Sequence, residues 1–205
     1  MRRLLVLAVL LLVAVLVTAC SDVHPDKIVT GKTRVKVDSP DLVAFKQKQT
    51  EIPNCPKVGS THVAGGLPDL TVPCLGGGRS VNVAGLRGPM IVNFWQSTCG
   101  PCREEMPALA AYARRQSAVK VLGIDILDVQ PGAALQLARD SKVGYPLVAD
   151  PAGNLVGRSP VPRQLGLPFT AFVSTSGKVV HVEAGAMTSE ADVRAAAQKY
   201  LGVAG

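Results

Sequence analysis

Two cysteines separated by two residues, in the CGPC segment Cys99–Cys102, constrain this chain more than any other feature. They directly follow Met90–Trp95, a short and mostly apolar run of β-prone residues. After them, apolar residues recur at helical spacing, at Met106, Leu109, Ala110 and Ala113. We therefore expect the cysteines to begin a helix immediately after a strand that is covered on both faces.

Strand-like and helix-like segments alternate along the rest of the chain. The elements expected downstream are a strand at Val119–Asp125, a helix at Gly132–Lys142, and strands at Pro146–Asp150, Phe169–Ser174 and Lys178–Glu183. Upstream, Leu70–Leu75 and Val81–Leu86 flank a glycine-rich turn and predict a hairpin. A last helix follows Ser189, which with Asp192 resembles a capping box. This order predicts an α/β domain whose parallel strands are joined by right-handed crossovers.

The first twenty residues form a targeting signal. Arg2 and Arg3 precede an uninterrupted apolar run, Leu4–Val17, which is short for a membrane span and typical of a signal peptide. Val17–Cys20 then resembles a bacterial lipobox, which predicts a signal peptide at 1–19 and lipidation of Cys20. An uncleaved anchor helix is the alternative. In both cases the rest of the chain lies on the extracytoplasmic face of the cell membrane, close to the lipid.

Residues 20–66 are expected to form a tether with some local structure towards its end. From Ser21 to Gly66 the chain is polar, shows little sustained apolar periodicity and carries four prolines, Pro25, Pro40, Pro53 and Pro56. A single domain is then expected over residues 67–205, since 205 residues leave no room for a second full enzymatic domain. The lysines and arginines are dispersed rather than clustered with aromatics, which argues against nucleic-acid binding.

Four cysteines remain when Cys20 is set aside, an even number that suggests two pairs in an exported protein. Cys99 and Cys102 form one pair by spacing. Cys55 and Cys74 are then predicted to form a structural disulfide that stabilises the fold by roughly 3 kcal/mol. The alternative is that they form a second redox couple, which passes electrons to Cys99.

A cysteine at the start of a helix lies beside unpaired backbone N–H groups and the positive end of the helix dipole, which stabilise a thiolate. We therefore assign Cys99 as the nucleophile and Cys102 as the thiol that resolves the mixed disulfide. Half of a zinc site and a purely structural disulfide are the alternatives. The three histidines are remote from the pair and no second CxxC exists, so no metal and no cofactor are expected.

The segment Phe94–Pro107, with the sequence FWQSTCGPCREEMP, resembles the active-site stretch of the TlpA/ResA-like thioredoxin family. The resemblance covers roughly residues 66 to 203, and the lipobox fits the membrane-anchored lipoproteins of that family. It implies a thioredoxin fold, with a central mixed sheet flanked by helices, an N-terminal β-hairpin and an inserted helix and strand. The activity it implies is that of a thiol-disulfide oxidoreductase.

The resemblance also implies roles for single residues. Gly166–Thr170 is similar to a loop whose proline, here Pro168, is cis and faces the dithiol; an ordinary trans turn proline is the alternative. The backbone of Leu167 is then expected to pair with an extended substrate. Glu105 matches an acidic residue of the family that tunes proton transfers at the cysteines. The alternative is that Glu105 is a surface glutamate of the helix. Asn93 stands where thioredoxins proper have a buried acid.

Three further residues complete the predicted substrate-binding set with Leu167. Gly100 and Pro101 lie between the cysteines, and Pro101 suits the first turn of a helix. Trp95 is expected to line the floor of the site, with simple core packing as the alternative. Thr98 and Phe169 depart from the residues usual in the family, which weakens inferences about substrate preference.

The leading hypothesis is a reductase of disulfides in exported proteins, with apocytochrome c as a candidate substrate. The family implies a membrane thiol carrier as its electron donor. An oxidase that forms disulfides in exported proteins is the nearest alternative. A peroxiredoxin-like peroxidase is disfavoured because its Pro-x-x-x-Thr-x-x-Cys spacing does not precede Cys99. A lipoprotein that binds a partner through a redox-inert thioredoxin scaffold is the non-enzymatic alternative.

Overall fold

The computed structural model describes residues 35–59, 61–115, 118–164 and 166–203. The predicted signal peptide at 1–19, the predicted lipidation site Cys20 and the first part of the predicted tether lie outside these residues. Within the described ranges, no helix is both long enough and apolar enough to cross a membrane.

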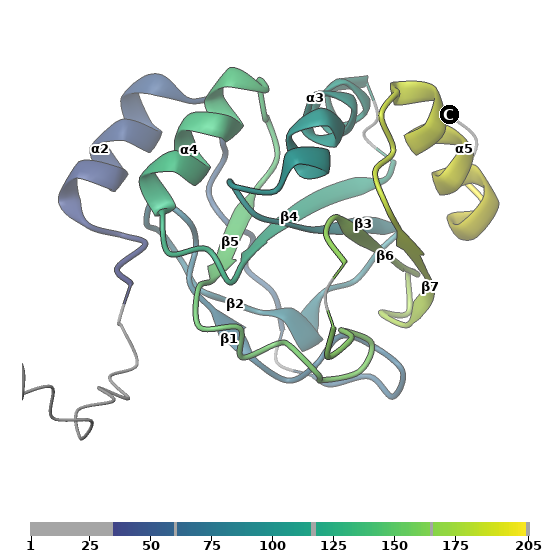
Figure 1. Cartoon of the computed structure of the whole chain (residues 1–205). Helices are drawn as coiled ribbons and strands as arrows, with labels where there is room; N and C mark the ends of the chain where they lie inside the picture. The colour runs from purple at the N-terminus through teal and green to yellow at the C-terminus, as the bar shows by residue number, and fades with distance from the viewer. Residues whose placement is uncertain (1–34, 60, 116–117, 165, 204–205) are drawn as a thin grey trace, which may run out of the picture. The chain divides into compact units, whose positions relative to one another are not determined.

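A five-stranded mixed sheet with the order β5-β4-β3-β6-β7 lies at the centre of the fold (Figure 1). The parallel strands are β3 (Met90–Trp95), β4 (Lys120–Ile126) and β5 (Leu147–Asp150). Two antiparallel strands, β6 (Phe169–Val173) and β7 (Val179–Ala184), extend the sheet on the other side of β3. Strand β3 is buried along its whole length, which explains its apolar sequence.

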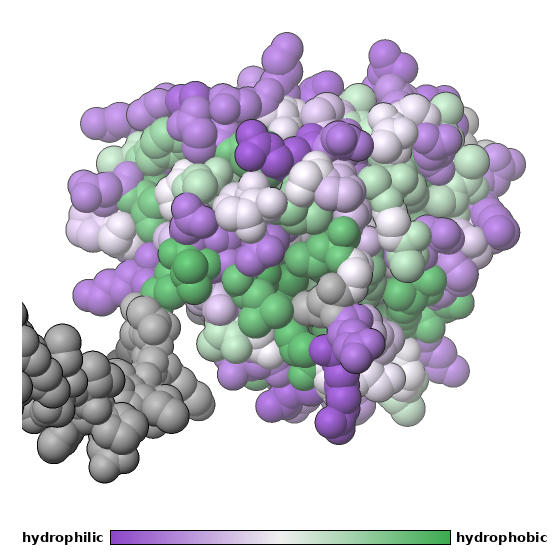
Figure 2. Space-filling model, in the orientation of Figure 1, coloured by the Kyte–Doolittle hydropathy of each residue, from purple (hydrophilic) through white to green (hydrophobic). Residues whose placement is uncertain are grey.

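Four helices lie in a row along one face of the sheet (Figure 1). They are α2 (Pro40–Gln49), α4 (Pro131–Asp140), α3 (Gly100–Arg115) and α5 (Glu190–Leu201). Hydrophilic side chains cover much of the outer surface of these helices in the view of Figure 2, while their apolar faces meet the sheet. Helix α5 begins with the predicted capping box, in which Ser189 and Asp192 bond each other's backbone N–H groups.

A second apolar cluster covers the opposite face of the sheet, so the sheet has a core on both sides. The predicted hairpin contributes to it, but its strands are shorter than expected. They are β1 (Thr71–Val72) and β2 (Val81–Asn82). The side chain of Asn82 accepts the N–H of Ala84 at 3.0 Å, which ends the strand and begins the 3₁₀ helix η1 (Val83–Gly85).

The predicted tether is too long at its C-terminal end. Residues 35–59 pack against the domain: Val37 and Ile52 are buried in the helix-side core, and α2 lies along α4 (Figure 1). The disulfide between Cys55 and Cys74 joins this segment to the chain that follows β1. The compact domain therefore begins well before residue 67, and the hydrophobic pattern of α2 was too weak to indicate it.

Candidate active site

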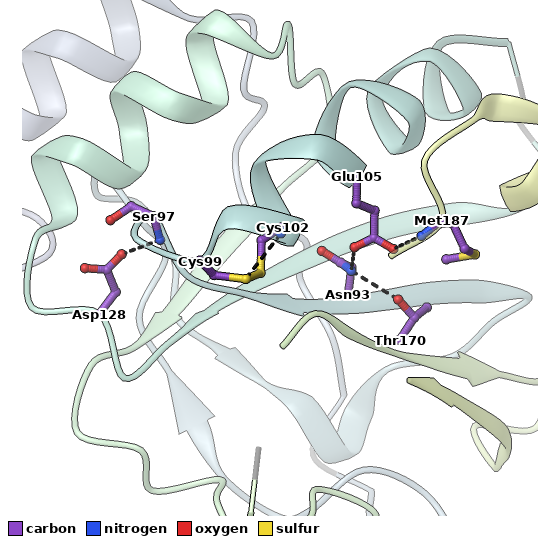
Figure 3. Close-up of a disulfide and its surroundings, with 8 residues drawn as sticks. All are labelled: Asn93, Ser97, Cys99, Cys102, Glu105, Asp128, Thr170 and Met187. Carbon is purple, nitrogen blue, oxygen red and sulfur yellow. Dashed lines mark hydrogen bonds between the residues drawn. A yellow bond between two sulfur atoms is a disulfide. The ribbon is translucent and has the colours of Figure 1, made fainter. Parts of the chain in front are cut away.

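Cys99 and Cys102 lie at the start of α3 and are joined by a disulfide, as the sequence pattern predicts for their position (Figure 3). The carbonyl of Cys99 accepts the N–H of Arg103 at 3.2 Å, so Cys99 is the residue that caps the helix. Cys99 is half-buried, whereas Cys102 is 1% exposed. An incoming disulfide can therefore reach the sulfur of Cys99 but not that of Cys102.

The sulfur of Cys99 already occupies the place of a capping acceptor. The backbone N–H of Cys102 points to Cys99 Sγ, with 3.2 Å between nitrogen and sulfur. In the reduced protein this N–H and the positive end of the α3 dipole stabilise a negative charge on Cys99. The geometry thus favours the thiolate form of Cys99 over the neutral thiol.

Glu105 lies one helical turn after Cys102, on the inner face of α3 (Figure 3). It is 1% exposed, so the alternative of a surface glutamate is wrong. Its Oε2 accepts an N–H of the Asn93 side chain at 2.7 Å, and its Oε1 accepts the backbone N–H of Met187 at 3.0 Å. Asn93 also donates to the hydroxyl of Thr170 at 3.1 Å, so strands β3 and β6 and the loop before α5 hold this carboxyl in place.

Burial raises the pKa of Glu105 to about 7, while the hydrogen bonds from Met187 and Asn93 lower it by smaller amounts. A carboxyl with this pKa exchanges its proton readily at neutral pH. It lies on the same helix face as Cys102, the buried thiol that must lose a proton in order to act. Asn93 therefore does not replace the acid of thioredoxins proper; it positions Glu105.

Two further carboxyls, those of Asp125 and Asp128, lie on the other side of the dithiol, and we did not predict them. Asp128 accepts the backbone N–H of Ser97 at 2.7 Å (Figure 3). It also accepts the backbone N–H of Gln130 at 2.7 Å. Asp125, at the end of β4, is 1% exposed, and burial together with the charge of Asp128 raises its pKa well above its ordinary value. Asp128 thus fixes the loop that leads to Cys99.

A sequence signal for this pair did exist. Asp125 lies near the carboxyl end of β4 and Asp128 follows that strand. Strand β4 pairs in parallel with β3, where Asp125 lies opposite Trp95. Because the carboxyl ends of parallel strands meet at one edge of a sheet, polar residues there lie close to the residues that follow β3.

The predicted substrate-binding residues fall into two groups. Gly100 and Pro101 are exposed beside Cys99, and Leu167 is half-buried and packs against the same apolar cluster as Cys99. Trp95, in contrast, is fully buried. This burial favours the core-packing alternative, and the role of Trp95 in substrate binding stays a prediction.

The peptide bond between Leu167 and Pro168 is cis, as the resemblance implies. Pro168 is buried, and its carbonyl accepts the N–H of Gly185 at 3.0 Å, just beyond β7. The role of Pro168 in catalysis stays a prediction. Among the described residues, no group of three or more His, Cys, Asp or Glu side chains is arranged to hold a metal ion.

Comparison with known proteins places these features in a family. The AhpC/TSA family profile matches residues 63–182. The chain is 32% identical over 140 residues to the thiol:disulfide interchange protein HelX of Rhodobacter capsulatus, covering 67% of this chain and 77% of HelX. It is 29% identical over 116 residues to the thiol-disulfide oxidoreductase ResA of Bacillus subtilis, covering 54% of this chain and 62% of ResA.

The fold is also similar to that of a solved structure. MTB DsbF, determined in mixed oxidized and reduced forms, superposes with a TM-score of 0.56 at 25% identity, covering 65% of this chain and 98% of DsbF. The thioredoxin fold and the resemblance to ResA-like proteins are thereby confirmed. The matched residues include the dithiol, Glu105 and Pro168, and the chain belongs to the AhpC/TSA family, with thiol-disulfide oxidoreductases of the ResA and HelX type as relatives.

Proposed function

We propose that this protein is an extracytoplasmic thiol-disulfide oxidoreductase that acts through the dithiol of Cys99 and Cys102. One observation carries the proposal: the half-buried sulfur of Cys99 caps α3 and is bonded to the fully buried sulfur of Cys102. The names of HelX and ResA, which describe thiol-disulfide exchange, support it.

The proposed reaction begins when the thiolate of Cys99 attacks a substrate disulfide. One substrate sulfur leaves as a thiol, and the other forms a mixed disulfide with Cys99. Cys102 then attacks Cys99 Sγ, which releases the second substrate thiol and restores the bond between Cys99 and Cys102. Glu105 accepts the proton of Cys102 in this second step, since it is the buried carboxyl on the same helix face.

Reduction of insulin disulfides in the presence of dithiothreitol tests the activity directly. The wild type is expected to accelerate the reaction, and Cys99→Ser is expected to abolish the acceleration because no nucleophile remains. Ser80→Ala, at an exposed residue in the β1–β2 connection, is the matched control and keeps full activity. No acceleration by the wild type over dithiothreitol alone would support the redox-inert binding lipoprotein instead.

We further propose that the protein works as a reductase and receives its electrons from a membrane thiol carrier. The Gly-Pro pair between the cysteines resembles that of strongly reducing thioredoxins, which supports this direction. Alkylation of intact cells, followed by separation of the oxidised and reduced forms, tests it. A largely reduced Cys99–Cys102 pair at steady state is expected, and a largely oxidised pair supports the disulfide-forming oxidase.

Exported proteins with closely spaced cysteines are the proposed substrates, with the CxxCH segments of apocytochrome c as the leading candidate. Removal of the resolving thiol in Cys102→Ser should leave substrates covalently attached to Cys99. Mass spectrometry of the captured proteins then identifies them. If only cytoplasmic proteins are captured from intact cells, the proposed location is wrong.

The proposed attachment to the membrane depends on Cys20. Lipidation is expected to keep the wild type in the membrane fraction, while Cys20→Ala releases it or blocks its processing. Incorporation of a labelled fatty acid into the wild type and not into Cys20→Ala is the direct measurement. A wild type that keeps residues 1–19 and incorporates no labelled fatty acid would support the uncleaved anchor helix.

A further inference from the structure

Lys46 is a buried lysine whose amine lies beside the second disulfide. It is 5% exposed, and its Nζ atom lies 3.4 Å from Cys74 Sγ and 3.3 Å from the carbonyl oxygen of Gly77. Among the described residues, no carboxylate lies within ion-pair distance of this amine. Burial lowers the pKa of Lys46. The amine is therefore held in the interior by two weak acceptors and without an anion.

The loop after Cys74 is shaped to receive this side chain. Gly76 and Gly77 have φ values of +70° and +83°, in the left-handed region that favours glycine. A Cβ atom at Gly76 would lie 2.9 Å from both Cβ and Cδ of Lys46, and one at Gly77 would lie 2.7 Å from Cγ2 of Val43. The glycines thus allow α2 to approach closely enough for the amine to reach the disulfide.

A cavity of about 280 Å³ opens between α2 and the glycine loop that follows Cys74. Its lining includes Lys46, Glu51, Asn54 and Gly76–Gly78. A Cβ atom at Gly78 would lie 3.6 Å from Cys74 Sγ, so no side chain separates this glycine from the sulfur. The cavity is large enough to admit a small thiol.

We propose that the bond between Cys55 and Cys74 is a second redox-active disulfide, and that Lys46 stabilises the Cys74 thiolate formed when it is reduced. In the disulfide the sulfur carries no charge, and no anion among the described residues pairs with the ammonium group to offset its desolvation. Reduction supplies the missing anion next to it. Lys46 therefore favours the reduced form and makes Cys74 the better leaving group.

The electrons come from a small external thiol. Its thiolate attacks Cys55 Sγ, and the bond breaks with Cys74 leaving as a thiolate. Cys55 is the more exposed residue of the pair, at 6% against 1% for Cys74. A second external thiol attacks the mixed disulfide and frees Cys55 together with the oxidised external disulfide. The two external thiols lose two electrons and two protons. The protein disulfide gains both electrons, Cys55 takes one proton, and the other passes to the solvent.

Redox equilibration of the full-length protein tests the proposal. Samples are equilibrated at graded ratios of reduced to oxidised dithiothreitol and alkylated, and peptide mass spectrometry reads each cysteine pair separately. In Lys46→Met, half-reduction of the pair Cys55 and Cys74 should need at least a tenfold more reducing ratio than in the wild type, or about 30 mV. The pair Cys99 and Cys102 is the internal control.

Lys48→Met, at an exposed lysine of the same helix, is the matched control and should leave both midpoints unchanged. A midpoint in Lys46→Met that lies within threefold of the wild type, or that moves the other way, overturns the proposal. So does a wild-type disulfide that dithiothreitol cannot open while the protein stays folded.

Reduced wild-type protein gives a second measurement that needs no variant. The alkylation rate of Cys74 should follow a thiol pKa below the ordinary value of about 8.5, because the neighbouring ammonium group favours the thiolate. A pKa of Cys74 at or above that value overturns the proposal. A merely structural role of Lys46 would change neither the midpoint nor this pKa.

Discussion

Glu105 links the stability of the oxidised protein to pH. Its pKa rises from 4.5 to about 7 on folding, so between these values the folded protein binds more protons than the unfolded chain. Stability must then fall as the pH rises through this window, by roughly 3 kcal/mol. Glu105→Gln should remove this loss, which urea unfolding at several pH values measures. Glu104→Gln, at the exposed neighbour, is expected to follow the wild type; an unchanged pH dependence in Glu105→Gln would contradict the assignment.

The same carboxyl should control the resolving step. A mixed disulfide between Cys99 and a chromogenic thiol releases that thiol when Cys102 attacks, and absorbance follows the release. In the wild type the rate is expected to rise as the pH passes 7, because Glu105 becomes an acceptor. Glu105→Gln should lose this rise and slow the release by about 100-fold, the lower end of what a positioned base contributes. A variant that keeps the wild-type profile would exclude this role.

Asp125 and Asp128 are predicted to respond in opposite ways to replacement by asparagine. Burial and then the charge of Asp128 raise the pKa of Asp125, so stability is lost as the pH rises above its unfolded value. Asp125→Asn should therefore raise the Tm at pH 7 by at least about 2 °C, and less at pH 4. Asp128→Asn should lower it, because two backbone N–H groups depend on that carboxylate. Calorimetry that finds both variants destabilised would refute the account of Asp125.

At the scale of single residues, the spacing of Cys99 and Cys102 is enough to locate the dithiol, because a thiolate at a helix start needs only the cysteines and the strand before them. The burial of Glu105 depends on Asn93 and Met187, which are 12 and 82 residues away in sequence. No local pattern carries that information, so only the family resemblance indicated the residue. The contact between Lys46 and Cys74 could not be predicted from sequence either, since the two residues are 28 positions apart.

At the scale of the elements, the capping box of α5 should contribute measurably to stability. The hydroxyl of Ser189 accepts the N–H of Asp192 at 3.1 Å, and Met187, which bonds Glu105, lies just before this helix. Ser189→Ala should cost about 1 kcal/mol and lower the Tm by about 2–4 °C. Ser80→Ala, at an exposed serine outside any helix, should leave the Tm unchanged. An equal Tm for both variants would show that the cap is dispensable.

The strands and helices of the sheet region could be predicted closely from sequence. The prediction for β3 matches the structure in both bounds, because a strand buried on two faces has a continuous apolar sequence. Helix α2 could not be predicted, because it contacts the domain through few apolar residues and through the stem of Lys46. The predicted strands of the β1–β2 hairpin were too long, because the turn at Asn82 interrupts a strand-like sequence.

At the scale of the whole molecule, the disulfide between Cys55 and Cys74 ties the N-terminal segment to the sheet. Its sequence separation of 19 residues corresponds to roughly 3 kcal/mol in the chain-entropy model. The double variant Cys55→Ala, Cys74→Ala should lose about this much unfolding free energy in urea, while the midpoint of the pair Cys99 and Cys102 stays unchanged. A shift of that midpoint would mean that the two disulfides are coupled.

The proposed reaction requires an ionised sulfur at Cys99. The most direct measurement is the pH dependence of the alkylation of Cys99 in the reduced, full-length protein, read by peptide mass spectrometry. The helix start and the N–H of Cys102 should place the pKa of Cys99 at least about one unit below the ordinary value of about 8.5. A pKa of Cys99 at or above 8.5 would contradict the account.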